Sequence, residues 1–118
     1  MHGPRDMQVD QVVDRFRRAV NMSAPELRSW LDTPESWSVG SKPEPGAESV
    51  GHAAGRYIVD LLGVRPEQLT RSDLAHMRKV AGFVARHIAQ RPDGDVRTTR
   101  WRYSLMNWGH DPLRSGSD

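Results

Sequence analysis

The stretch from Thr70 to Gln90, TRSDLAHMRKVAGFVARHIAQ, carries the clearest structural signal in the chain. At about 100° per residue, its apolar side chains fall on a single arc of a helix. They are Leu74, Met77, Val80, Ala81, Val84 and Ile88. Thr70 and Asp73 have the three-residue spacing of a capping box, which marks where a helix begins. The stretch therefore predicts an amphipathic helix from about residue 71 to about residue 90.

Four further segments show helical signals of the same kind. In the first segment, apolar side chains recur at three- and four-residue spacing. Before the second, Ser23 and Glu26 form a capping box. The second helix should stop near Thr33, because Pro34 follows. The four segments span about residues 6–20, 24–33, 49–62 and 96–108. No stretch alternates convincingly between apolar and polar residues. We therefore expect an all-α fold, a single compact domain of about five helices.

The segments between these helices have the composition of loops and turns. Residues 38–48, SVGSKPEPGAE, hold two Pro, two Gly and two Ser, and we expect them to form a mobile loop between the second and third helices. Gly63 stands where a left-handed helix C-cap is expected. The domain should cover residues 1–114, and the polar residues 115–118 should form a disordered tail.

Length and composition exclude several classes of protein. The 118 residues suffice for one domain of ordinary size. The chain has no Cys, which excludes disulfides, cysteine zinc sites and thiol catalysis. No apolar run reaches the roughly 18 residues of a membrane span, and residues 1–6 lack the apolar stretch of a secretion signal. A soluble, cytoplasmic protein with no membrane role is the default expectation.

Charge is distributed unevenly along the chain. The formal net charge is only +2, with 17 basic and 15 acidic residues. Residues 23–64 nevertheless carry more acidic than basic side chains, whereas residues 78–102 hold seven basic residues and two acidic ones. Any role for basic charge should therefore lie in the second half of the chain.

Basic side chains gather opposite the apolar arc of the helix at 71–90. The four are Arg71, Arg78, Lys79 and Arg86, with the small residues Ala75 and Gly82 between them. Small residues would let a phosphate ridge approach the helix backbone while the flanking cations reach its oxygens. An ordinary solvated helix face has the same pattern, so both interpretations stay open.

The last predicted helix mixes aromatic and basic residues. Trp101, Leu105 and Trp108 share one side and are predicted core residues. Basic side chains on or before this helix could assist phosphate binding, and interleaved aromatic and Arg side chains also occur where bases stack. They are Arg91, Arg97, Arg100 and Arg102. The alternative is a helix wedged among others, with Arg side chains bonded to helix ends.

Histidines and serines suggest catalytic or metal sites only weakly. His76 and His87 lie roughly 16 Å apart along a helix, so they cannot bind one metal ion together. A metal site would need His52 or His110 beside one of them, together with a carboxylate such as Asp111. A triad built on Ser49 or Ser104 lacks a nucleophile elbow, and no phosphate-binding Gly-rich loop is present. Gly51 and Gly55, four residues apart, indicate close helix packing. We expect no enzyme activity, cofactor or metal.

Three groups of motifs resemble a known protein family. They are Asn21-Met22-Ser23 with Trp30-Leu31 and Ser38-Val39-Gly40; Glu48-Ser49-Val50-Gly51-His52 with Gly55-Arg56; and a block over residues 76–112 that ends in RWRYSLMNWGHDP (100–112). The sequence resembles bacterial members of the DUF3140 family, which also occurs in fungi, over about residues 8–114. The resemblance implies no catalytic residue, because the family is named for having no known function; some members carry a DNA-binding label.

Two functional hypotheses follow. The first is a small helical DNA-binding protein that grips the phosphate backbone with little base specificity. Its binding residues would be Arg71, Arg78, Lys79, Arg86, Arg91, Arg97, Arg100 and Arg102. The second is a protein-interaction or structural module, either a homodimer or a partner-binding domain, that uses the Trp-rich helices and the acidic middle segment.

Overall fold

A computed structural model describes residues 4–114 of the chain. Its helices are α1 (Pro4–Ala19), α2 (Ala24–Leu31), α3 (Pro34–Trp37), α4 (Val50–Leu61), α5 (Arg71–Ile88) and α6 (Arg100–Asn107), with one 3₁₀ turn at Pro66–Gln68. No strand occurs within these residues, so the predicted all-α class is confirmed. None of these helices is long and apolar enough to cross a bilayer. The predicted tail at 115–118 lies outside the described residues.

The two capping boxes expected from the sequence are present. Ser23 Oγ accepts from the Glu26 N–H at 3.2 Å, and Glu26 Oε1 accepts from the Ser23 N–H at 2.9 Å. Thr70 and Asp73 make the same reciprocal pair at 3.1 and 3.0 Å. Each box satisfies backbone donors that a helix start leaves without partners. These local bonds explain why α2 and α5 begin where they were predicted to begin.

Two helix boundaries differ from the prediction. The last helix starts at Arg100 rather than near residue 96, because the Thr99 side chain caps it and accepts from the Arg102 N–H. The expected left-handed C-cap at Gly63 is wrong: α4 ends at Leu61, its C-cap residue Leu62 has right-handed backbone, and Gly63 has no positive φ. The chain leaves α4 through right-handed turns instead, in which the Gly63 N–H donates to the Asp60 carbonyl.

The short helix α3 was not predicted. Thr33 caps it and Pro34 occupies its first turn, where a missing N–H costs nothing. Its position depends on a distant residue. The Asn107 side chain, 1% exposed, accepts from Ser36 Oγ at 2.5 Å and donates to the Ser36 carbonyl at 3.0 Å. A helix of four residues is too short to show apolar periodicity, and the bonds that position this one come from α6. The sequence therefore carried no local signal for it.

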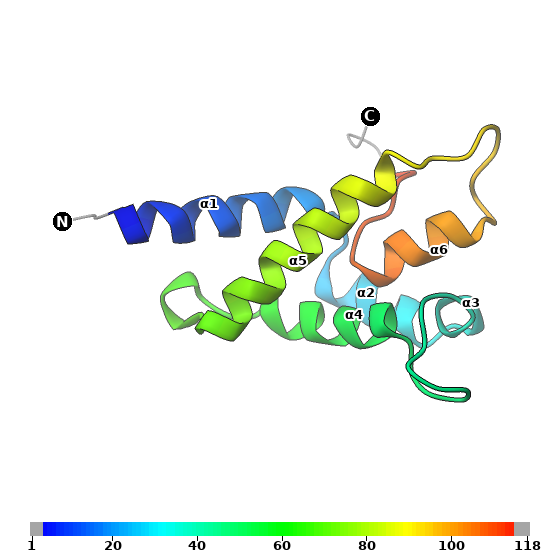
Figure 1. Ribbon diagram of the computed structural model, residues 1–118, viewed down its shortest axis with the longest axis horizontal. Helices are drawn as coiled ribbons and strands as arrows, with labels where there is room; N and C mark the ends of the chain where they lie inside the picture. The colour runs from blue at the N-terminus through cyan, green and yellow to red at the C-terminus, as the bar shows by residue number, and fades with distance from the viewer. Residues whose placement is uncertain (1–3, 115–118) are drawn as a thin grey trace.

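Helix α5 forms the centre of the molecule (Figure 1). It runs diagonally between α1 on one side and the group formed by α2, α4 and α6 on the other. Helix α1 packs mainly against α5, while α2 packs against α4, and α6 contacts α2, α3, α4 and α5. One face of α5 therefore supports α1, and its other sides meet α6, Tyr57 of α4 and solvent.

Most helices contribute one or two large side chains to the core. The best-buried apolar residues are Phe16, Leu27, Ile58, Val80 and Leu105, each at most 1% exposed. Trp101 and Trp108 are also buried, as predicted. Along α5, Met77, Val80 and Val84 are buried, but Ile88 is 41% exposed. Ile88 ends the apolar arc as the last residue of α5, where its side chain lines an open groove.

Gly51 and Gly55 confirm the predicted close packing. A Cβ on Gly55 would lie 2.4 Å from the Asn107 carbonyl oxygen and 2.8 Å from Leu31 Cδ2. Any side chain there would push α6 and α2 away from α4. The absence of a side chain at this position lets the end of α6 rest directly on α4.

Candidate functional site

The basic side chains of α5 all reach solvent. Arg71, Arg78, Lys79 and Arg86 are exposed, and none of them forms an ion pair with a residue in the range 4–114. Ala75, between them, is exposed as well, and Gly82 is half-buried. A Cβ on Gly82 would meet only the Arg86 guanidinium, at 3.0 Å. The Arg86 side chain therefore lies across the surface that Gly82 leaves open.

Neighbouring helices divide this basic face into two regions. Arg78 and Gly82 line a groove between α5 and α1. Lys79 and Arg86 line a smaller pocket on the opposite flank, formed with α4, α6 and residues 40–41. The sequence pattern joined these cations into one stripe. In the fold they face two separate hollows.

The groove between α1 and α5 has a basic rim and an apolar floor. Its volume is about 720 Å³. Three arginines line it, Arg15 and Arg18 from α1 and Arg78 from α5, together with Gln8 and Gln11. The floor consists of Val12, Ala19, Ala81, Gly82, Val84, Ala85 and Ile88. No carboxylate is among the lining residues, so the groove suits an anionic ligand.

Arg15 and Arg18 were missed by the sequence reasoning. Their signal was a polar stripe along the first helix, in which Gln8, Gln11, Arg15 and Arg18 recur at three- and four-residue spacing. This stripe did not stand out as basic, because the exposed acids Asp10 and Asp14 lie on the same helix and offset its charge. Arg18 pairs with Asp14 at 3.0 Å, and both side chains are more than half exposed. Such a surface pair is weak and leaves Arg18 able to exchange partners.

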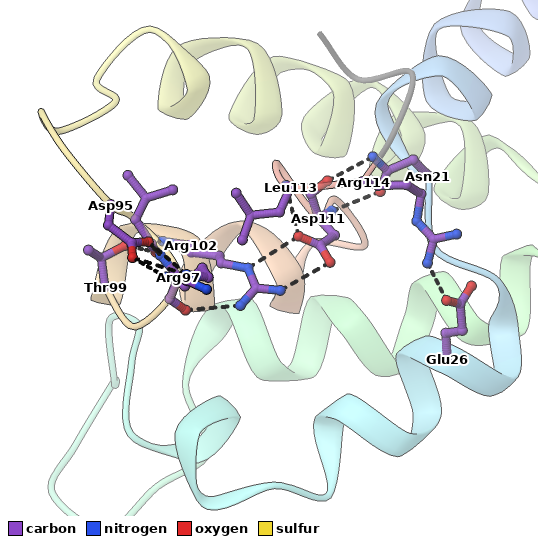
Figure 2. Close-up of polar contacts among 10 residues, drawn as sticks. Asn21, Glu26, Asp95, Arg97, Thr99, Arg102, Asp111, Leu113 and Arg114 are labelled. Atoms are coloured by element: carbon purple, nitrogen blue, oxygen red, sulfur yellow. Dashed lines mark hydrogen bonds and ion pairs between the residues drawn. The ribbon is translucent and has the colours of Figure 1, made fainter.

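Two of the predicted binding residues are engaged in internal ion pairs (Figure 2). Arg97 Nη2 lies 2.7 Å from Asp95 Oδ2, and this hydrogen-bonded contact lowers the pKa of Asp95 to about 2. Arg102 Nη2 lies 3.2 Å from Asp111 Oδ2, and Arg102 Nη1 donates to the Arg97 carbonyl at 2.9 Å. The charge of Arg102 is therefore compensated within the fold, whereas the Arg97–Asp95 pair is as exposed as the Arg18–Asp14 pair and is equally weak.

The last two predicted binding residues differ from each other. The Arg91 guanidinium lies over the Trp101 ring, 5.5 Å from its centroid, in cation–π geometry. Arg100 is exposed at the first position of α6 and pairs with no carboxylate among residues 4–114. The contact with Trp101 thus fixes the position of the Arg91 side chain, whereas Arg100 remains available to a ligand.

A row of six stacked rings runs beside the basic face. In order they are Tyr57, His76, Trp108, Phe83, His87 and Trp101, with neighbouring centroids 4.3 to 6.3 Å apart. Trp108 fills the gap between His76 and Phe83, which lie two turns apart on α5. Burial lowers the pKa of both His76 and His87, so their rings stay neutral at neutral pH. The row packs α5 against α6 through flat surfaces.

The histidines considered as metal ligands lie in separate environments. His76 and His87 belong to the ring row, His110 Nδ1 donates to the Ala19 carbonyl at 2.8 Å, and His52 contacts Glu48 and the Leu31 carbonyl. Among the described residues, no three metal-binding side chains gather in one place. Ser49 Oγ caps α4 by accepting from the His52 N–H, and it is 1% exposed.

Residues of the sequence motifs hold the helices together. Asn21 and Asp111 exchange two hydrogen bonds, at 2.7 and 3.0 Å, that join the α1–α2 junction to the segment after α6. Trp30 Nε1 donates to Asn107 Oδ1 at 2.7 Å, which connects α2 to α6. These motifs are therefore explained by the fold, and the candidate anion surfaces lie beside them.

Comparisons with known proteins gave one match. Neither the search of curated proteins nor that of solved structures found a similar chain. The family model that matches is described as a protein of unknown function, DUF3140, and it aligns with residues 15–106. That range covers most of the chain and includes every helix except the start of α1 and the end of α6. The chain therefore belongs to the DUF3140 family.

Proposed function

We propose that the protein binds duplex DNA through the groove between α1 and α5. The observation that carries the proposal is the composition of this groove: Arg15, Arg18 and Arg78 line it and no carboxylate does. Its floor of small residues, Ala81 and Gly82 among them, allows a phosphate ridge to come close to the α5 backbone. Arg71 at the start of α5 and Arg100 at the start of α6 are further exposed arginines.

The geometry favours contact with phosphates over recognition of bases. Arginines on two helices would reach phosphate oxygens from both sides of the groove, and such contacts carry no sequence information. Helix α1 packs mainly against α5, so it is not an isolated helix of the kind that enters a major groove. Binding should therefore be tolerant of sequence and sensitive to salt.

The experiment is a fluorescence anisotropy titration of a mixed-sequence duplex. With three or four phosphates neutralised, affinity should fall about a hundredfold between 50 and 200 mM salt. The double variant R15E/R78E should lose measurable binding while its helical circular dichroism stays unchanged. A matched control is R17E/R28E, which makes the same change in net charge at two exposed arginines outside the groove.

Equal losses in the two double variants would contradict the groove as the binding site. Binding unaffected by R15E/R78E would contradict the proposed function altogether. The control variant should lose only the modest affinity that follows from its changed net charge, because long-range attraction is screened at these salt concentrations.

The alternative is a protein-interaction module, and one exposed side chain favours it. Trp37 is 45% exposed on α3 and stacks on His52 with ring centroids 3.9 Å apart. Exposed Trp side chains are enriched at protein interfaces. A dimer that persists at high salt in sedimentation, is lost in Trp37→Ser and shows no duplex binding would favour this function over the first.

A further inference from the structure

We infer that the smaller pocket on the opposite flank of α5 binds the phosphate group of a small phosphomonoester. The pocket lies between the start of α4, the middle of α5 and the end of α6, and its volume is about 220 Å³. Lys79 and Arg86 contribute two positive charges to its wall. No carboxylate lines it, and neither cation is paired with an acidic residue in the described part of the chain.

The Trp108 indole N–H group is an available donor in this wall. Trp108 is only 4% exposed, and its Nε1 donates to no atom of the residues that the structure describes. The other two tryptophans with buried or half-buried rings, Trp30 and Trp101, donate to oxygens at 2.7 and 2.6 Å. Indole N–H groups of largely buried tryptophans usually find a hydrogen-bond partner. A ligand oxygen in this pocket could therefore accept from the Trp108 N–H.

Gly51 makes this N–H group accessible. A Cβ at Gly51 would lie 2.9 Å from Trp108 Nε1 and would cover it. Gly51 also stands in the first turn of α4, where the Val50 and His52 N–H groups donate to Ser41 O and Ser49 Oγ. The Gly51 N–H has no such partner within residues 4–114. It is a second free donor in the pocket wall, at the positive end of a twelve-residue helix.

The donors together match one kind of ligand. The Trp108 and Gly51 N–H groups, the half-buried Ser104 hydroxyl and the two cations all line the pocket. Asn107 also lines it, but its oxygen is already used by Trp30 and Ser36. A phosphomonoester dianion offers three acceptor oxygens and two negative charges, which complement this set.

Size and shape limit the rest of the ligand. Drug-sized ligands occupy sites of about 300–1,000 Å³, and this pocket is smaller, at about 220 Å³. Phe83 and Trp108 stack on each other with centroids 4.3 Å apart, so they offer the pocket ring edges rather than open ring faces. The pocket therefore suits a phosphate that carries a small apolar group. The inference is independent of the proposed function, because Arg78 and the α1 arginines line a different hollow.

The experiment follows the indole N–H signals of the ¹⁵N-labelled full chain by NMR. Inorganic phosphate and phenyl phosphate should shift the Trp108 signal, assigned from Trp108→Phe, and should leave those of Trp30 and Trp101 in place. Phenyl phosphate should bind more tightly, because its ring adds apolar contact with the edges of Phe83 and Trp108. Absence of a Trp108 shift with both probes overturns the inference.

Variants then locate the binding. Arg86→Gln should weaken phenyl phosphate binding by about tenfold, because it removes a charged partner. Ser104→Ala removes only a hydroxyl and should weaken binding by less. Arg78→Gln is the matched control on the same helix and should leave phosphate binding unchanged while it weakens duplex binding. A similar loss in Arg78→Gln and Arg86→Gln overturns the inference, because it would mean diffuse attraction to the whole helix.

Two further probes define the ligand chemistry. Benzoate has a similar ring and one negative charge, so it should bind several-fold more weakly than phenyl phosphate; equal binding overturns the phosphate assignment. A short oligonucleotide with a 5′-phosphate is compared with its unphosphorylated form. A Trp108 shift with inorganic phosphate and the phosphorylated strand, but none with phenyl phosphate, places the phosphomonoester at a strand end. A shift with phenyl phosphate places it on a free small molecule.

Discussion

Glu48, His52 and Arg56 lie one helical turn apart around the start of α4 and form a single polar cluster. Arg56 Nε and Nη2 donate to the two Glu48 oxygens at 2.8 and 2.5 Å. His52, 3% exposed, contacts Glu48 Oε2 through Nδ1 and the Leu31 carbonyl through Nε2, at 2.5 and 2.7 Å. The His52 ring therefore links the Glu48 carboxylate to the carbonyl at the end of α2.

This cluster predicts a stability change at low pH. Hydrogen bonds from Arg56, then from His52, lower the pKa of Glu48 from 4.5 to about 2. The folded pKa lies below the unfolded one, so the stabilisation is complete above about pH 4.5 and is lost as the pH falls toward 2. Glu48→Gln should cost about 2 kcal/mol at neutral pH and flatten the acid limb of stability. Urea unfolding between pH 2.5 and 7 measures both effects.

Glu35→Gln provides the control for this prediction, because Glu35 is exposed and forms no ion pair within the described residues. Glu26 and Asp95, whose pKa values are also lowered to about 2, will keep part of the acid limb in every variant. An acid limb as steep in Glu48→Gln as in the wild type would show that the cluster does not stabilise the fold.

At the scale of elements, α4 and α6 cross without side chains between them at Gly55. An alanine there would place its Cβ 2.4 Å from the backbone oxygen of Asn107. Since backbone cannot move as a flexible side chain can, α6 must shift and its contacts with α2 and α3 must loosen. We expect Gly55→Ala to destabilise the protein by about 3 kcal/mol, which chemical denaturation measures.

Gly82→Ala is the matched change on α5, where the new Cβ would meet only the end of the Arg86 side chain at 3.0 Å. Alanine is the better helix former by up to about 1 kcal/mol. Gly82→Ala should therefore be neutral or slightly stabilising. A loss at position 82 as large as that at position 55 would mean that helix α5 packs more tightly than the structure shows.

The sequence predicted elements whose signals are local. Apolar periodicity and capping boxes act within four residues, and they placed the starts of α2, α4 and α5 within a residue or two. Helix α3 has four residues, too few for a period, and its Ser36 is anchored by Asn107 of α6. The helix end at Gly63 was misjudged because glycine permits a left-handed cap without requiring one.

At the scale of the whole molecule, residues 109–111 connect the segment after α6 to the turn between α1 and α2. The Gly109 carbonyl accepts from the Asn21 and Met22 N–H groups at 3.1 and 3.2 Å. Asn21 and His110 add side-chain bonds between the same two segments. The segment after α6 thus fixes the turn between α1 and α2, and with it the angle at which α1 lies on α5.

Gly109→Ala tests this closure. Gly109 has φ +83°, a conformation that costs other residues about 1–2 kcal/mol, and a Cβ there would lie 2.9 Å from Val20 Cγ1. We expect a loss of about 3 kcal/mol, measured as a lowered thermal midpoint. Gly94→Ala, with nearly the same φ but nothing within 4 Å of the new Cβ, should lose only the backbone cost. Equal losses would mean that contact with Val20 contributes nothing.

The amino-acid sequence by itself determined the helices, their caps and the exposed basic face of α5, because helical periodicity and capping depend on residues within one turn of each other. Only the tertiary structure decided which cations remain available. Arg102 is neutralised by Asp111 across a turn, whereas Arg15 of α1 joins Arg78 of α5 across some sixty residues of chain. Such pairings arise from helix packing, which sequence spacing does not encode, and they turned one predicted basic stripe into a groove and a separate pocket.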